Sequence, residues 1–123
     1  MAKRILVIDD DLGVTGLLES SLKAWGFEVQ IALNAANGLS MLEKGIFDGV
    51  TLGLVMPRMK GVECLRRLRQ RHPSLPVAII SGGYNRLTES EMDFVKENTQ
   101  ALLWKPFNLT QLRLIVSRCF RRV

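Results

Sequence analysis

Short apolar runs alternate along this chain with segments in which apolar residues recur every three or four positions. Five runs have the length of buried strands, at residues 5–8, 27–33, 50–55, 77–80 and 101–104. Each run is followed by a segment with the spacing of an amphipathic helix. Five strand–helix units in succession predict a parallel sheet with helices on both faces.

Polar residues mark where several of these helices begin. Asn34 can cap the second helix, and Thr88 with Glu91 and Asn108 with Gln111 have the spacing of capping boxes. The predicted apolar stripes of the first two helices include Leu12, Leu17 and Ile46.

Length and composition favour one domain over residues 1–123, because 123 residues that are 47% hydrophobic can bury a substantial core. No run of 18 apolar residues could cross a membrane, and the first apolar run is too short for a signal peptide. We therefore expect a cytoplasmic domain that does not insert into membranes. Cys64 and Cys119 are expected to be buried reduced thiols, with a disulfide as the alternative.

The net charge of +5 also admits a nucleic-acid-binding module. The basic residues are spread over two helices, and no aromatic residues interleave with them: Arg66, Arg67, Arg69, Arg71, Arg113, Arg118, Arg121 and Arg122. Solvated helix faces or a protein-binding surface explain this pattern more simply than nucleic acid does. The basic end from Arg118 to Val123 fits either a stand-alone domain or the approach to an output domain.

Residues with potential chemistry follow four of the predicted strands: the acids 9–11, Gly53, Ser81 and Lys105. Taken singly, Asp11 could cap a helix, Ser81 could be a turn residue and Lys105 could be an exposed lysine. The carboxyl ends of parallel strands meet at one edge of the sheet, so these residues should lie together. Acids can hold a divalent cation, while a hydroxyl and an ammonium can hold anionic oxygens. That combination suits reversible phosphorylation of an aspartate.

Four motifs in this order make the chain resemble, over essentially its whole length, the receiver domain of bacterial two-component response regulators. They are residues 5–11, residues 47–57 with Gly61, residues 77–81 and residues 103–107. The resemblance implies a flavodoxin-like (βα)5 doubly wound fold with a five-stranded parallel sheet in the order 2-1-3-4-5. It also implies a signalling module of a phosphorelay rather than an enzyme.

The resemblance assigns roles to individual positions. Asp9 and Asp10 match the acidic pair that organises Mg²⁺, with Asp10 and the backbone carbonyl of Val55 as direct ligands. Ser81 matches the hydroxyl residue that contacts the phosphoryl group. Lys105 matches the lysine that pairs with the acidic site, and its bond to the following proline is expected to be cis.

The chain departs from the family where the phosphoacceptor aspartate should stand, because Gly53 occupies that position. Asp48 begins the same strand, about 16 Å away at ~3.3 Å per residue, and Thr51 lies deeper on the same side. The acids 9–11 are near enough to be alternative acceptors. With one carboxylate missing, we expect a weakened Mg²⁺ site and a direct pair between Lys105 and Asp10.

Leu102 stands where the family usually has an aromatic switch residue, and leucine cannot make that ring movement. We therefore expect a pseudo-receiver that acts through protein–protein interaction. Its expected partners are a sensor histidine kinase, other two-component proteins, or a second copy bound through the fourth helix, fifth strand and fifth helix. A working phosphotransfer receiver, with Gly53 as an introduced change or with another acceptor, and a basic nucleic-acid-binding module remain the alternatives.

Overall fold

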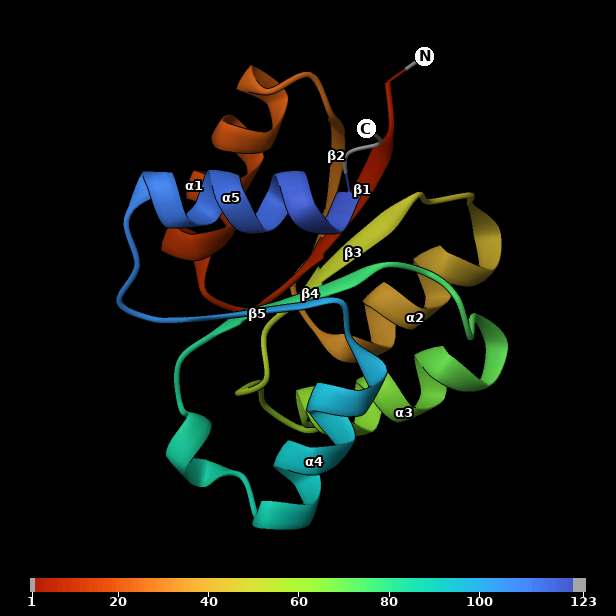
Figure 1. The fold of residues 1–123 in the computed structure, drawn as a ribbon. Coiled ribbons are helices and arrows are strands. Elements are labelled where there is room, and N and C mark those ends of the chain that lie inside the picture. The colour runs from red at the N-terminus through yellow and green to blue at the C-terminus, as the bar shows by residue number, and fades with distance from the viewer. Residues whose placement is uncertain (1, 121–123) are drawn as a thin grey trace.

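The computed structural model describes residues 2–120, which form a parallel sheet with helices on both faces (Figure 1). The strands are β1 (Arg4–Ile8), β2 (Glu28–Ala32), β3 (Gly49–Leu52), β4 (Val77–Ser81) and β5 (Ala101–Trp104). Their order is β2-β1-β3-β4-β5, and every neighbouring pair is parallel. The predicted flavodoxin-like topology is therefore confirmed.

The helices divide between the two faces of the sheet. They are α1 (Leu12–Ala24), α2 (Ala35–Lys44), α3 (Gly61–Arg71), α4 (Glu89–Asn98) and α5 (Leu109–Phe120), with a short 3₁₀ helix η1 (Tyr84–Arg86) before α4. Figure 1 shows α1 and α5 on one face and α2, α3 and α4 on the other. This division gives the domain two apolar layers.

Strand residues alternate between these two layers, because successive side chains of a strand point to opposite faces. Leu6 and Ile8 of β1 belong to the cluster under α2, α3 and α4, whereas Ile5 and Val7 belong to the cluster under α1 and α5. All four side chains are fully buried. A central strand buried on both faces explains why its sequence reads as a continuous apolar run.

The predicted caps are present and fix where the helices start. The Asp11 carboxylate accepts hydrogen bonds from the backbone N–H groups of Gly13 and Val14, and Asn34 caps α2. Both predicted capping boxes form with reciprocal hydrogen bonds, from Thr88 with Glu91 and from Asn108 with Gln111.

The third strand is shorter than predicted, because it ends at Leu52 rather than at Val55. Gly53 still donates its N–H to the carbonyl of Ile8 at 2.9 Å, but the N–H of Leu54 donates to the Ser81 hydroxyl instead of a strand carbonyl. The ladder stops there, and Gly53 is the first residue beyond the strand.

Three residues of the predicted apolar stripes do not face the core. Leu12, Leu17 and Ile46 are exposed, and Ile46 follows α2 in the loop to β3. Helix α1 instead buries Thr15, Leu18, Ser21 and Leu22. The prediction was wrong because apolar residues cover more than half of the α1 circumference, so the pattern does not fix which face is buried.

Both cysteines are free and buried, as predicted. Burial raises the pKa of each thiol, Cys64 and Cys119, to about 12, so neither is a reactive thiolate at neutral pH. Arg121 and Arg122 lie outside the described residues. Over residues 2–120, every helix is too short or too polar to cross a membrane.

Candidate functional site

The carboxyl ends of β1, β3, β4 and β5 surround a cavity of about 390 Å³. Its lining consists of Asp9, Asp10, Asp11, Val55, Ser81, Gly82, Gly83, Arg86 and Lys105. The acids, Ser81 and Lys105 are thus brought together as the strand-end pattern predicted. Val55, half-exposed, also lines the cavity, in agreement with its predicted place beside the acids.

Gly53, the first residue after β3, is buried next to Asp9 of this cavity, and the carboxylate of Asp9 lies against it. Ile8 pairs with Leu52 in the ladder between β1 and β3, so the next residues, Asp9 and Gly53, are neighbours. A Cβ atom added to Gly53 would lie 2.7 Å from Oδ2 and 2.8 Å from Cγ of Asp9. These distances are shorter than van der Waals contact, so the Asp9 carboxylate fills space that a side chain at position 53 would need.

Asp9 is held in this place by the start of α1. Its Oδ1 accepts a hydrogen bond from the backbone N–H of Asp11 at 3.1 Å. The side chain is only 5% exposed, and burial raises the pKa of the Asp9 carboxyl, although the Asp11 N–H and the Lys105 ammonium oppose the rise. The ionised form of Asp9 therefore destabilises the folded protein.

Lys105 pairs with Asp11 rather than with Asp10, which corrects the prediction. Its Nζ lies 3.4 Å from Oδ2 of Asp11, while the Asp10 side chain is exposed to solvent. The Val14 N–H and then Lys105 hold the pKa of the Asp11 carboxyl below its ordinary value. Asp11 lines the cavity as the N-cap of α1, so its carboxylate is within reach of Lys105. The Lys105–Pro106 bond is cis, as expected.

The Ser81 hydroxyl is buried and fully engaged. It accepts from the Leu54 N–H at 2.9 Å and donates to the Gly82 carbonyl at 2.8 Å. The backbone carbonyl of Ser81 accepts from the N–H of Lys105 at 2.9 Å. Ser81 therefore ties the loop after β3 to the ends of β4 and β5, and its hydroxyl would have to exchange partners to reach a ligand.

The other predicted positions do not line this cavity. Leu102 of β5 is partly buried against the cluster under α2, α3 and α4. The Thr51 hydroxyl is buried in β3 and has no hydrogen-bond partner within the described chain. Asp48 is at the opposite end of the sheet, where its Oδ2 accepts from the Arg4 N–H at 2.8 Å. Neither residue presents an oxygen to the cavity.

Arg86 is a lining residue that the sequence did not reveal. It comes from η1 and reaches the cavity because the chain turns at Gly83, whose φ of 74° favours glycine. No motif marks this arginine, and only the path of the loop places it near the acids. It adds a second cation to the rim, beside Lys105.

The acidic oxygens do not form a complete cage for a metal ion. Mg²⁺ needs oxygen ligands in near-octahedral geometry. Asp9, Asp10 and Val55 line the cavity, and carboxylate and carbonyl oxygens are donors of the kind that Mg²⁺ takes. Within residues 2–120, however, no three His, Cys, Asp or Glu side chains gather as a metal-binding group. The side chains of the described residues therefore do not form a complete metal site.

Comparison with known proteins identifies relatives of this chain. A family model described as the response regulator receiver domain matches residues 5–117. The transcriptional regulatory protein ZraR of Klebsiella oxytoca is 31% identical over 113 residues, covering 92% of this chain and 25% of that protein. Response regulator MprA of Mycobacterium bovis is 32% identical, covering 99% of this chain and 52% of that protein.

Solved structures give the same picture. NtrX from Brucella abortus superposes with a TM-score of 0.85 at 29% identity, covering 98% of this chain and 27% of that chain. A CheY-like receiver domain protein from Methanospirillum hungatei has a TM-score of 0.86 at 26% identity, covering 95% of this chain and 92% of that one. The chain spans about a quarter of ZraR and about half of MprA.

Proposed function

Because this chain belongs to the response regulator receiver domain family, we propose that it is a receiver of two-component signalling that works without phosphorylation at the usual position. The observation that carries the proposal is the relationship between Gly53 and Asp9. The acceptor position offers no oxygen, and the carboxylate of Asp9 lies in the space that an acceptor side chain would need.

The chemistry of the family requires a carboxylate oxygen that attacks phosphorus while cations neutralise the phosphoryl oxygens. Lys105 is present as such a cation, but its ammonium is paired with Asp11. The loss of one carboxylate also lowers the affinity expected for Mg²⁺, which protein sites hold weakly even with all their ligands. The pairing of Lys105 and the weakened Mg²⁺ site both favour a domain that stays in one conformation, the unphosphorylated one.

Signalling in this state would depend on contacts with other proteins. The proposed surface is the face formed by α4, β5 and α5, which carries a hollow of about 290 Å³. Its lining is mixed apolar and basic: Lys96, Thr99, Gln100, Ala101, Leu102, Ile115 and Arg118. The partner would be a histidine kinase, another two-component protein or a second copy of this chain.

The position of Asp9 also supports a second candidate function, in which Asp9 itself is the acceptor. Its carboxylate oxygen would attack the phosphorus of a donor such as acetyl phosphate, and acetate would leave. Asp9 lines the cavity beside Lys105, which favours this reaction. Its burial and its hydrogen bond to Asp11 oppose it, because both restrain the carboxylate.

Incubation with acetyl phosphate and Mg²⁺, followed by intact-mass spectrometry, tests the proposal. The protein should gain no phosphoryl group, while the matched variant Gly53→Asp should gain one. A stoichiometric adduct on the unaltered protein would overturn the proposal. Its loss in the variant Asp9→Asn would then identify Asp9 as the acceptor.

A further inference from the structure

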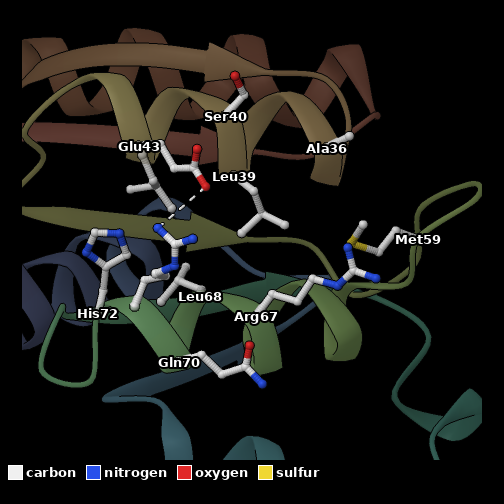
Figure 2. Close-up of a pocket in the computed structure, with 11 residues that line it drawn as sticks. Ala36, Leu39, Ser40, Glu43, Met59, Arg67, Leu68, Gln70 and His72 are labelled. Carbon is white, nitrogen blue, oxygen red and sulfur yellow. Dashed lines mark ion pairs between the residues drawn. The ribbon is translucent and has the colours of Figure 1, made fainter.

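A second concave surface lies between α2 and α3, on the face of the sheet away from α1 and α5. The hollow measures about 410 Å³, and Figure 2 shows its side chains projecting from both helices. Apolar groups form much of the lining: Ala36, Leu39, Leu42, Met59 and Leu68. The neighbouring hollow of about 540 Å³ shares Met59 and Arg67 with it, so the two hollows adjoin along α3, and together they are called the α2–α3 groove.

The rim of this α2–α3 groove is predominantly basic. Five cationic side chains line the two hollows: Arg58, Lys60, Arg66, Arg67 and Arg71. Three carboxylates stand against them: Glu43, Glu63 and Glu91. The groove therefore carries an excess of positive charge around an apolar floor.

The ion pairs that cross the rim are weak enough to be exchanged. Arg71 reaches Glu43 of α2 at 3.8 Å, and the two side chains are 73% and 60% exposed. Glu63 is shared between Arg66 at 3.5 Å and Arg67 at 3.0 Å, and all three side chains are about half-exposed. Exposed pairs of this kind contribute little to stability. Carboxylates of a partner could replace them at little cost.

We propose that the α2–α3 groove binds an acidic, amphipathic helical segment of a partner protein. Apolar residues of that segment would cover Leu39 and Met59, and its flanking acids would pair with Arg67 and Arg71. This mode, in which the apolar face of a helix enters a groove, is read by anchors at i, i+3, i+4 and i+7. The surface is distinct from the acidic pocket and from the face of α4, β5 and α5.

Nucleic acid fits the same surface less well. A phosphate backbone would gain from the arginines but would leave the apolar floor of Leu39 and Met59 uncovered. An acidic, amphipathic peptide can cover the apolar floor with its apolar residues and pair with the arginines of the rim through its acids.

The test uses a synthetic helix-forming peptide with leucines at i, i+3, i+4 and i+7 and glutamates on both flanks. It is titrated into the ¹⁵N-labelled full chain and followed by NMR. The expected result is saturable shifts confined to the amides of residues 36–43 and 58–72 and to those around Glu91, which also lines the groove. Arg67→Glu and Arg71→Glu should each weaken binding by about tenfold. The matched control Arg113→Glu, on α5 at the other face, should leave binding unchanged.

Several results would overturn the proposal. Shifts at other amides, or none at millimolar peptide, would remove the groove as a binding site. Equal binding by a peptide with serines for leucines, or by one with lysines for glutamates, would show that the floor or the rim has no role.

A single-stranded oligothymidylate that bound these amides more tightly would assign the surface to nucleic acid. Changes at the same amides on dilution of the free protein would assign it to a second copy. Dispersed spectra of every variant would show that folding is retained.

Discussion

The carboxylate of Asp9 occupies the space beside Gly53 in which a side chain would begin, with Oδ2 only 2.7 Å from the position of an added Cβ. The residues that follow β1 and β3 therefore present one carboxylate between them, that of Asp9. Asp9 remains buried and hydrogen-bonded to Asp11 instead of pointing toward solvent. The acids 9–11, Ser81 and Lys105 line the pocket, whereas Gly53 has no side-chain oxygen to add to it.

Gly53→Asp should restore a metal site. The atoms of Asp9 nearest the new Cβ belong to the end of a side chain, which can rotate away and turn its oxygens toward the cavity. Two adjacent carboxylates repel each other, and a divalent cation relieves that repulsion. Calorimetric titration should show Mg²⁺ binding about tenfold tighter or more than in the unaltered protein. Gly53→Asn, which adds a similar volume without charge, should show no such gain.

Asp9→Asn should stabilise the domain at neutral pH by roughly 1 kcal/mol, because a buried carboxylate with a raised pKa is destabilised when ionised. The amide oxygen can still accept from the Asp11 N–H. The folded pKa lies above the unfolded one, so the unaltered protein loses stability as the pH rises through that interval. The gain in the variant should therefore be small below about pH 4 and appear above it. Urea unfolding at a series of pH values measures it, and a gain independent of pH would contradict this explanation.

Gly61→Ala should be severely destabilising. A Cβ at the first residue of α3 would overlap the backbone carbonyl of Gly53 and would lie 2.5 Å from Cα of Leu54, and backbone atoms cannot rotate away. We expect a loss of roughly 2–4 kcal/mol in the free energy of unfolding. Gly16→Ala on α1 is the control, since nothing lies within 4 Å of its added Cβ. Alanine there should stabilise by about 0.5–1 kcal/mol through helix propensity. Similar losses in both variants would contradict the steric explanation.

Arg69 joins the ends of α3 and α4 to the sheet. Its guanidinium donates to the carbonyls of Asn98, His72 and Leu75 at 2.8–2.9 Å and to the side chain of Gln100 at 3.2 Å. Arg69→Met should lower stability by roughly 2–3 kcal/mol, because these partly buried carbonyls lose a charged donor. Thermal unfolding measures the loss.

The matched control for this prediction is Arg67→Met, two positions earlier on the same helix. Among residues 2–120, Arg67 has one ion pair, an exposed one with Glu63, so its loss should change stability by about 0.5 kcal/mol or less. Equal losses of stability in the two variants would show that the four hydrogen bonds of Arg69 contribute no more than an exposed ion pair does.

The sequence pattern predicted a parallel sheet and most of the pocket, because both depend on features that one sequence displays, whereas the strand order came from the resemblance to receiver domains. Apolar runs such as residues 5–8 mark the strands, and polar residues directly after them must meet at the carboxyl edge of a parallel sheet. The helix caps were equally readable, since Thr88 and Glu91 satisfy each other through purely local hydrogen bonds.

The features that could not be predicted depend on side-chain orientation. The sequence placed Asp9 near Gly53 but did not show that its carboxylate lies over the glycine. Lys105 was predicted to pair with Asp10, and it pairs with Asp11 because that residue faces the cavity as a helix cap. Arg86 reaches the site through the path of a loop that no motif describes.

The central claim, that the acceptor position offers no oxygen to phosphorus, is tested most directly with beryllofluoride, which binds an acceptor carboxylate as a phosphoryl mimic. Fluorine NMR of the protein with beryllium, fluoride and Mg²⁺ should show no protein-bound resonances. The same titration of Gly53→Asp should show them at stoichiometric intensity. Bound resonances of that intensity on the unaltered protein would contradict the account.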